Sequence, residues 1–156
     1  MRTLLHPASK NAALTDVALL LSRVALGLIL LAHGWQKLNE YTVAGTAASF
    51  AQLGVPSPTA AATFATAVEL VGGAALILGL LTPVAALLNI ANLVGALVLV
   101  HAGKGIFVQN GGYELVLALA AGLGAIAVLG AGKLSLDGLV GRRYTERRTA
   151  LAPATA

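Results

Sequence analysis

Residues 59–81 read TAAATFATAVELVGGAALILGLL, an apolar stretch with a single acid, Glu69, near its middle. A helix needs about 20 apolar residues to cross the hydrocarbon core of a bilayer, and this stretch is that long. An ionised side chain at mid-bilayer costs several kcal/mol, so it marks a functional site by default. The stretch therefore predicts a membrane-spanning helix that does more than anchor the protein.

Three further apolar stretches of similar length lie around it, at about residues 16–38, 83–101 and 113–131. Prolines and glycines separate them, as expected where one helix ends and the next begins. The chain is 58% hydrophobic and only 10% charged, whereas soluble domains carry roughly 25% charged residues. We therefore expect an all-α fold, an integral membrane four-helix bundle formed by residues 16–132.

Basic residues set the expected orientation of this bundle. Most of the ten Lys and Arg residues lie in the terminal segments 1–15 and 133–156, whereas the opposite loops hold only Lys37 and Lys104. Because basic residues gather on the cytoplasmic side, the N- and C-termini should both be cytoplasmic. The segment 133–156 is expected to be a basic interfacial stub followed by disorder.

The first external loop, residues 39–58, is too long for a simple turn. Val43, Ala47, Phe50 and Leu53 recur in it at helical spacing, which predicts a short helix lying on the membrane surface.

Several function classes are excluded. The chain has no cysteine, so it can form neither disulfides nor thiolate metal sites nor a CxxC redox centre. It contains no dinucleotide-binding, P-loop or hydrolase motif. The basic residues lack the groove motifs or aromatic platforms of nucleic-acid binding. With no redox centre apparent in the chain, any electrons must come from elsewhere.

The first apolar helix carries three ionisable residues that share one face. At 100° per residue, Arg23, His33 and Lys37 fall within an arc of about 80°. Trp35 lies well off this face and is expected to anchor the helix toward lipid. The face continues through Gly27, Leu30 and Gly34, which indicates that it points into the bundle.

Counting about 1.5 Å per residue places Arg23 roughly 10 Å, and Glu69 roughly 18 Å, above the cytoplasmic ends of their helices. An extended Arg side chain can span most of that gap, so we predict an Arg23–Glu69 ion pair. Such a pair can simply fix the register of the helices. Alternatively, it forms the polar floor of a ligand cavity or part of a proton relay.

A second group of polar residues is expected at the external mouth of the bundle. Glu114 opens the last helix, where capping alone would explain a carboxylate. A metal site at His33, His101 and Glu114 lacks the usual ligand spacing, and no metal is predicted. Paired histidines could also hold a haem, but hydrogen bonding to a neighbour or to a bound quinone is the preferred interpretation. The candidate ligand-binding residues are His33, Lys37, His101 and Asn110.

The third apolar helix cannot turn all its polar groups to one cavity. On an ideal α-helix, His101 lies 180° from Asn92 and 120° from Asn89.

The chain closely resembles the DoxX family of bacterial four-helix membrane proteins. The resemblance rests on LSRVALGLILLAHGWQKL, LGVPSP, VELVGGAALILGLLTPVAALL, VHAGKGIF, QNGGYELVLALAA and GAGKLSLD, in this order between about residues 16 and 137. It implies a multi-pass protein of the bacterial plasma membrane, related to subunits of a thiosulfate:quinone oxidoreductase and to proteins of redox-stress and quinone responses. The family's polar positions that also serve here as site candidates are Arg23, His33, Lys37, Glu69, His101, Asn110 and Glu114.

Three functions remain open. The first is a quinone-interacting subunit of a membrane oxidoreductase complex, with Arg23, Glu69 and Glu114 handling protons and a protein partner supplying electrons. The second is a scaffold or assembly factor whose polar core only fixes helix packing, alone or as an oligomer. The third is a small transporter or proton-leak pathway, against which the lack of an inverted repeat argues.

Overall fold

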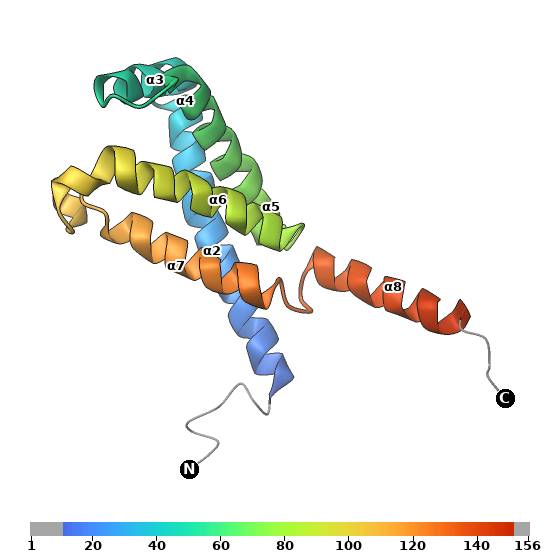
Figure 1. Cartoon of the computed structure of the whole chain (residues 1–156). Coiled ribbons are helices and arrows are strands. Elements are labelled where there is room, and N and C mark those ends of the chain that lie inside the picture. The colour runs from blue at the N-terminus through green and yellow to red at the C-terminus, as the bar shows by residue number, and fades with distance from the viewer. Residues whose placement is uncertain (1–10, 152–156) are drawn as a thin grey trace, which may run out of the picture.

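The computed structural model describes residues 11–151, with side chains described for residues 11–144. All regular secondary structure in this part of the chain is helical, which confirms the all-α prediction (Figure 1). The elements are α2 (Ala12–Asn39), α3 (Thr42–Gln52), α4 (Pro58–Ala67), the π-helix η2 (Val68–Gly72), α5 (Gly73–Leu78), α6 (Thr82–Ala96), the π-helix η3 (Leu97–His101), the 3-10 helices η4 (Ala102–Lys104) and η5 (Val108–Asn110), α7 (Glu114–Leu129) and α8 (Leu136–Leu151).

The first long helix, α2, begins at Ala12, earlier than the sequence predicts. Asn11 caps it, because its side-chain oxygen accepts a hydrogen bond from the Leu14 amide at 3.2 Å. Trp35 is 60% exposed, as a lipid-facing residue would be. The buried face consists of Arg23, Gly27, Leu30 and Gly34, which confirms the predicted inward face for these four residues. Of the other two residues predicted on this face, Lys37 is half-buried and His33 is exposed.

The second long helix consists of α4, η2 and α5 and runs antiparallel to α2 (Figure 1). It begins at Pro58. Proline suits this position, because the amide of a first helical residue makes no hydrogen bond within the helix. It ends at Leu78 and is capped by Gly79, whose φ of 67° is left-handed and favours glycine. The two helices pack closely: a Cβ on Gly27 would lie 2.7 Å from the Gly73 carbonyl oxygen. Glycine on each helix therefore permits this backbone contact.

The predicted short helix in the first loop is present as α3. It packs against α4 and the end of α2. Ala47 is buried and Val43 and Phe50 are half-buried, so three of the four apolar residues that predicted this helix turn toward the bundle. The fourth, Leu53, follows the last residue of α3 and is exposed. Its position on a membrane surface stays a prediction.

The third long helix, α6 followed by η3, pairs with α7 in an antiparallel hairpin that crosses α2 (Figure 1). Pro83 lies in the first turn of α6, where its ring is tolerated. The hydrophobic core lies between this hairpin and the α2–α5 pair. Its best-buried side chains are Leu30, Leu76, Ala86, Leu123 and Ile126.

Three of these helices are long and apolar enough to cross a membrane: Ala12–Asn39, Pro58–Leu78 and Thr82–Lys104. Val71, Val98 and Val128 are 60–86% exposed, which suits contact with lipid better than contact with water. The fourth apolar helix, α7, has 16 residues and is about 24 Å long, shorter than a typical ~30 Å hydrocarbon core. Four spans and cytoplasmic termini therefore stay predictions.

The segment after α7 differs from the prediction. Leu136–Leu151 is a helix of 16 residues, where a stub followed by disorder was expected; residues 152–156 lie outside the described part. Ser135 caps this helix, since its hydroxyl oxygen accepts a hydrogen bond from the Gly138 amide at 2.9 Å. Figure 1 shows α8 directed away from the other helices.

Candidate functional site

Three polar side chains meet between α2, η2 and α6. Lys37 Nζ donates to Glu69 Oε2 at 2.6 Å, and the Asn92 side-chain amide donates to Glu69 Oε1 at 3.1 Å. The side chains of Lys37 and Glu69 are only 18% and 8% exposed, so the ion pair is shielded from solvent. The two donors offset the cost of burying the Glu69 carboxylate, which would be large for an unpaired charge.

Local helix geometry explains why Glu69 lies here. It belongs to the π-helical turn η2, and such turns within α-helices occur frequently at functional sites. On the facing helix, a Cβ at Gly34 would lie 3.0 Å from Glu69 Cβ and 2.8 Å from the Leu70 backbone nitrogen. Because Gly34 has no side chain, α2 and η2 can approach closely. Lys37, about one turn further along α2, then reaches the Glu69 carboxylate.

This network forms one wall of a cavity of about 320 Å³ between α2, η2, α6, η3 and α7, which we call the chamber. Ligand pockets in proteins typically measure about 300–1,000 Å³, so the chamber can hold a small ring. Much of its wall is apolar. Its lining includes the polar residues His33, Lys37, Glu69, Asn92 and His101 and the apolar residues Leu30, Phe50, Leu93, Val116 and Leu119.

The two histidines of the chamber are held in defined tautomers. His101 Nδ1 lies 2.6 Å from the Gly111 carbonyl oxygen, and His33 Nδ1 lies 2.9 Å from the Ile29 carbonyl oxygen. A carbonyl can only accept, so Nδ1 carries the hydrogen in both rings. Each neutral ring then keeps Nε2 as an acceptor, which becomes a donor on protonation.

The π-helical turn η3 explains how His101 lines the same cavity as Asn92. A π turn contains an extra residue and rotates the following residues by about 100° relative to an α-helix, so the ideal-helix angle does not apply to His101. Asn89 points elsewhere, because its side-chain amide donates to the Ala85 and Val68 carbonyl oxygens at 2.9 and 3.3 Å. The prediction that this helix cannot turn every polar group to one cavity is confirmed by Asn89.

The predicted Arg23–Glu69 ion pair is wrong. The depth estimate placed the cytoplasmic ends of the two helices at one level, but α2 extends beyond the end of α5. Arg23 consequently lies beside Gly79, where a Cβ would be 2.7 Å from Arg23 Nη1. Its guanidinium donates to three backbone carbonyl oxygens, those of Leu76 at 3.0 Å, Ile77 at 2.6 Å and Leu134.

Asp137 adds to this second polar region, the Arg23 cluster, which comprises Arg23, Asp137 and the backbone groups that they bind. The Asp137 carboxylate accepts from the Leu81 and Thr82 amides at 2.8 and 2.9 Å. These amides lie at the start of α6, where a helix leaves backbone donors unpaired. Arg23 is 1% exposed, and its hydrogen bonds all go to backbone. The cluster therefore joins helix ends, and both of its charged side chains bind backbone groups.

Two further candidates, Glu114 and Asn110, do not line the chamber. Glu114 Oε1 accepts from the Val108 amide at 2.7 Å, which closes the loop before α7. This backbone contact favours a structural role for the carboxylate over the proton-handling one. Asn110 is exposed in η5. Among the described residues, no three His, Asp or Glu side chains are grouped so as to hold a metal ion.

Two chamber residues, Asn92 and Phe50, were not among the predicted site residues. The sequence could have indicated Asn92, since a polar amide within an apolar span, like the Glu69 carboxylate, is costly to bury without a partner. Phe50 reaches the chamber from α3 only because of how that helix packs, which no local pattern indicates.

These features define a helical membrane protein in which a shielded polar network borders a largely apolar chamber. The DoxX family model matches residues 18–102, from α2 to the first residue of η4, a range that includes Lys37, Glu69, Asn92 and His101. The chain belongs to the DoxX family, as the sequence resemblance indicated.

Two relatives extend this assignment. The chain is 32% identical over 125 residues to "Putative oxidoreductase CatD" of Bacillus subtilis, an alignment that covers 80% of this chain and 88% of that protein. It is 33% identical over 141 residues to "Uncharacterized membrane protein Rv3486" of Mycobacterium tuberculosis, with 82% of each chain covered. No solved structure matches the chain.

Proposed function

We propose that this protein is a quinone-interacting subunit of a membrane oxidoreductase complex in the bacterial plasma membrane. The observation that carries the proposal is the Lys37–Glu69–Asn92 network on the wall of an otherwise largely apolar chamber. A quinone has the matching chemistry, an apolar ring whose two carbonyl oxygens accept hydrogen bonds. Both relatives come from bacteria, and the name of one includes the word oxidoreductase, which supports a role in a bacterial oxidoreductase complex.

The donors and acceptors of the chamber fit a quinone head group. Lys37 Nζ has three hydrogens, and Glu69 accepts one of them at 2.6 Å. A second Lys37 hydrogen is therefore available to a ligand oxygen. His33 and His101 add an Nε2 each, which accepts from a hydroxyl when neutral and donates when protonated.

Protons and electrons have separate sources in this proposal. Reduction of a quinone consumes two electrons and two protons. His33, His101 and the Lys37–Glu69 pair are groups that hold and exchange protons at the chamber wall. The chain lacks cysteine and hence any dithiol or thiolate-bound cluster, so a protein partner is expected to deliver the electrons.

Binding of a short-tailed quinone to purified protein in nanodiscs tests the proposal. We expect Lys37→Met to weaken binding roughly 10- to 100-fold, because a hydrogen bond to a charged group contributes about 1.5–3 kcal/mol. Isothermal titration gives the Kd, and circular dichroism shows whether the variant is folded. The matched control is Lys104→Met, since Lys104 is exposed and does not line the chamber.

Glu69→Gln provides the second arm, with exposed Glu40→Gln as its control. A folded Glu69→Gln protein that no longer binds quinone would support the proposal. No binding by the wild-type protein, or equal binding by Lys37→Met and Lys104→Met, would refute it.

One observation favours the scaffold function as a second candidate. The Lys37–Glu69 pair connects α2 to η2, and a buried ion pair can serve only to fix how helices meet. In that case Glu69→Gln loses stability, while wild-type protein gains none from added quinone.

A further inference from the structure

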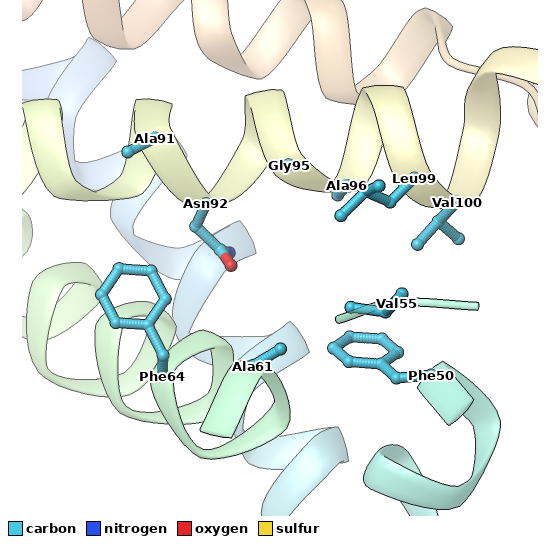
Figure 2. A pocket seen from close by; sticks show the side chains of 10 residues that line it. All are labelled: Phe50, Val55, Ala61, Phe64, Ala91, Asn92, Gly95, Ala96, Leu99 and Val100. Atoms are coloured by element: carbon cyan, nitrogen blue, oxygen red, sulfur yellow. The ribbon is translucent and has the colours of Figure 1, made fainter. Parts of the chain in front are cut away.

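A second, smaller cavity lies beside the chamber, on the outer side of the helices. It measures about 140 Å³ and lies between α4, the end of α3 and the α6–η3 helix. Figure 2 shows the side chains that line it, and Asn92 is the polar one among otherwise apolar residues. We call it the side groove; its lining includes Val55, Ala61, Phe64, Ala91, Gly95 and Leu99.

Small residues and diverging helices create the side groove. The third helix packs on the second through η2 and α5; beyond these contacts, α6 leads away from α4 (Figure 1). Ala61 on α4 faces Ala96 and Gly95 on α6 across the opening (Figure 2). A Cβ at Gly95 would meet no atom within 4 Å, so this glycine borders open space and is not needed for close helix packing.

The side groove and the chamber share part of their walls. Phe50, Asn92, Ala96 and Val100 line both cavities. Asn92 also donates to Glu69 at 3.1 Å, so one side chain borders the apolar groove and takes part in the polar network. The two cavities are therefore neighbours, separated by the side chains that line both, so a tail that leaves the chamber past these side chains enters the apolar groove.

That outer surface is the part of the molecule expected to meet lipid. The groove lies between the apolar spans Pro58–Leu78 and Thr82–Lys104. Phe64 and Leu99, at its edges, are 45% and 44% exposed. An apolar groove that opens between two membrane-spanning helices is accessible to molecules dissolved in the bilayer, without passage through water.

We propose that the side groove holds the apolar tail of the ligand whose head occupies the chamber, so that the ligand is a quinone with an isoprenoid or alkyl tail that enters sideways from the bilayer. This inference rests on the proposed function. It adds a position for the tail, between α4 and α6, and assigns Gly95 the role of keeping that position open.

The test compares two quinones, one with a single isoprene unit and one with a decyl tail, in nanodiscs, with Kd expressed as mole fraction in the bilayer. Wild-type protein should bind the decyl quinone at least tenfold more tightly. Gly95→Phe should fill the side groove and remove this preference, while the Kd of the short quinone changes less than twofold. Gly124→Phe is the matched control, since a Cβ on Gly124 in α7 would also meet no atom within 4 Å.

Circular dichroism and the melting temperature show whether Gly95→Phe folds, and Gly95→Leu is the smaller alternative if it does not. Failure of both quinones to bind wild-type protein would overturn the proposed function and this inference with it. Equal binding of both quinones to wild-type protein would overturn only the inference. Dodecanol tests the other occupant: if its binding depends on Gly95 as strongly as that of the decyl quinone, the groove takes lipid chains in general and the inference is wrong.

Discussion

The Arg23 cluster and the chamber wall each contain a shielded, positively charged residue of α2, Arg23 and Lys37, yet they differ in the partners of their charges. Arg23 and Asp137 bind backbone carbonyls and amides at helix ends. Lys37 and Glu69 bind each other and border a cavity of about 320 Å³. A buried charge in an apolar helix therefore does not by itself identify a ligand site. The partners and the adjacent space decide.

The physical reason lies in where each charge meets the helices. A helix end has backbone groups without intrahelical partners, and a guanidinium or carboxylate there satisfies them. Mid-helix backbone is already paired, so a charge such as Glu69 must find side-chain partners. Such side-chain partners keep hydrogens or lone pairs that a ligand can use.

The largest expected effect is that of Arg23→Met. It removes the guanidinium donor from the Leu76, Ile77 and Leu134 carbonyl oxygens, of which that of Leu76 keeps the Gly79 amide as a partner. Loss of this buried guanidinium should cost about 4 kcal/mol of unfolding free energy. SDS titration of purified protein, followed by circular dichroism, measures this loss. Exposed Arg142→Met is the control.

The same variant tests whether the two regions are independent. Arg23 lies about 21 Å along α2 from Lys37, so folded Arg23→Met protein should bind a short-tailed quinone with unchanged Kd. A tenfold loss of affinity in folded protein would show that the two regions are coupled.

Lys37→Met should destabilise the protein by about 3 kcal/mol, because it leaves the Glu69 carboxylate buried with only Asn92 as partner. The double variant Lys37→Met/Glu69→Leu should recover at least half of that loss, since it removes both charges. Unfolding free energies of the single and double variants give the coupling. Quinone binding should stay lost in the double variant. Its return would mean that the pair serves stability alone.

Gly34→Ala should cost about 2 kcal/mol, because the added methyl group meets Leu70 backbone at 2.8 Å and Glu69 Cβ at 3.0 Å. It should also weaken quinone binding by displacing Glu69 from Lys37. Gly124→Ala has no such neighbours and should be neutral or stabilise by about 0.5 kcal/mol. Equal melting temperatures for the two variants would contradict the close approach of α2 and η2.

Asp137→Asn should have the smallest effect, about 1 kcal/mol. The amide keeps one acceptor for the Leu81 or Thr82 amide and loses the other, as with a weakened helix cap. Thermal unfolding measures the loss, and the Kd for quinone should stay within twofold of the wild-type value. If the Kd rose by more than the loss of stability can explain, Asp137 would contribute to quinone binding in the chamber.

Local patterns were sufficient to predict some features and not others. The apolar stretches predicted the long helices, and the arc of about 80° on α2 predicted its buried face through Gly27 and Gly34, because helix periodicity is a local property. The choice of partner for Glu69 was beyond such reasoning. It depends on how far α2 is shifted along its axis relative to the helix that holds Glu69. If this shift is misjudged by a few turns, Arg23 takes the place of Lys37 as the predicted partner.

The sequence by itself determined that the chain is helical, rich in apolar spans, free of cysteine and provided with a few ionisable groups that must be buried. These follow from composition and from a 3.6-residue period. Tertiary structure alone decided which charges meet. It also decided where the π-helical turns η2 and η3 rotate Glu69 and His101 toward one chamber, and that residues 136–151 form the helix α8. Those outcomes depend on contacts between residues far apart in the chain, since helix register and turn type are fixed by what packs against them.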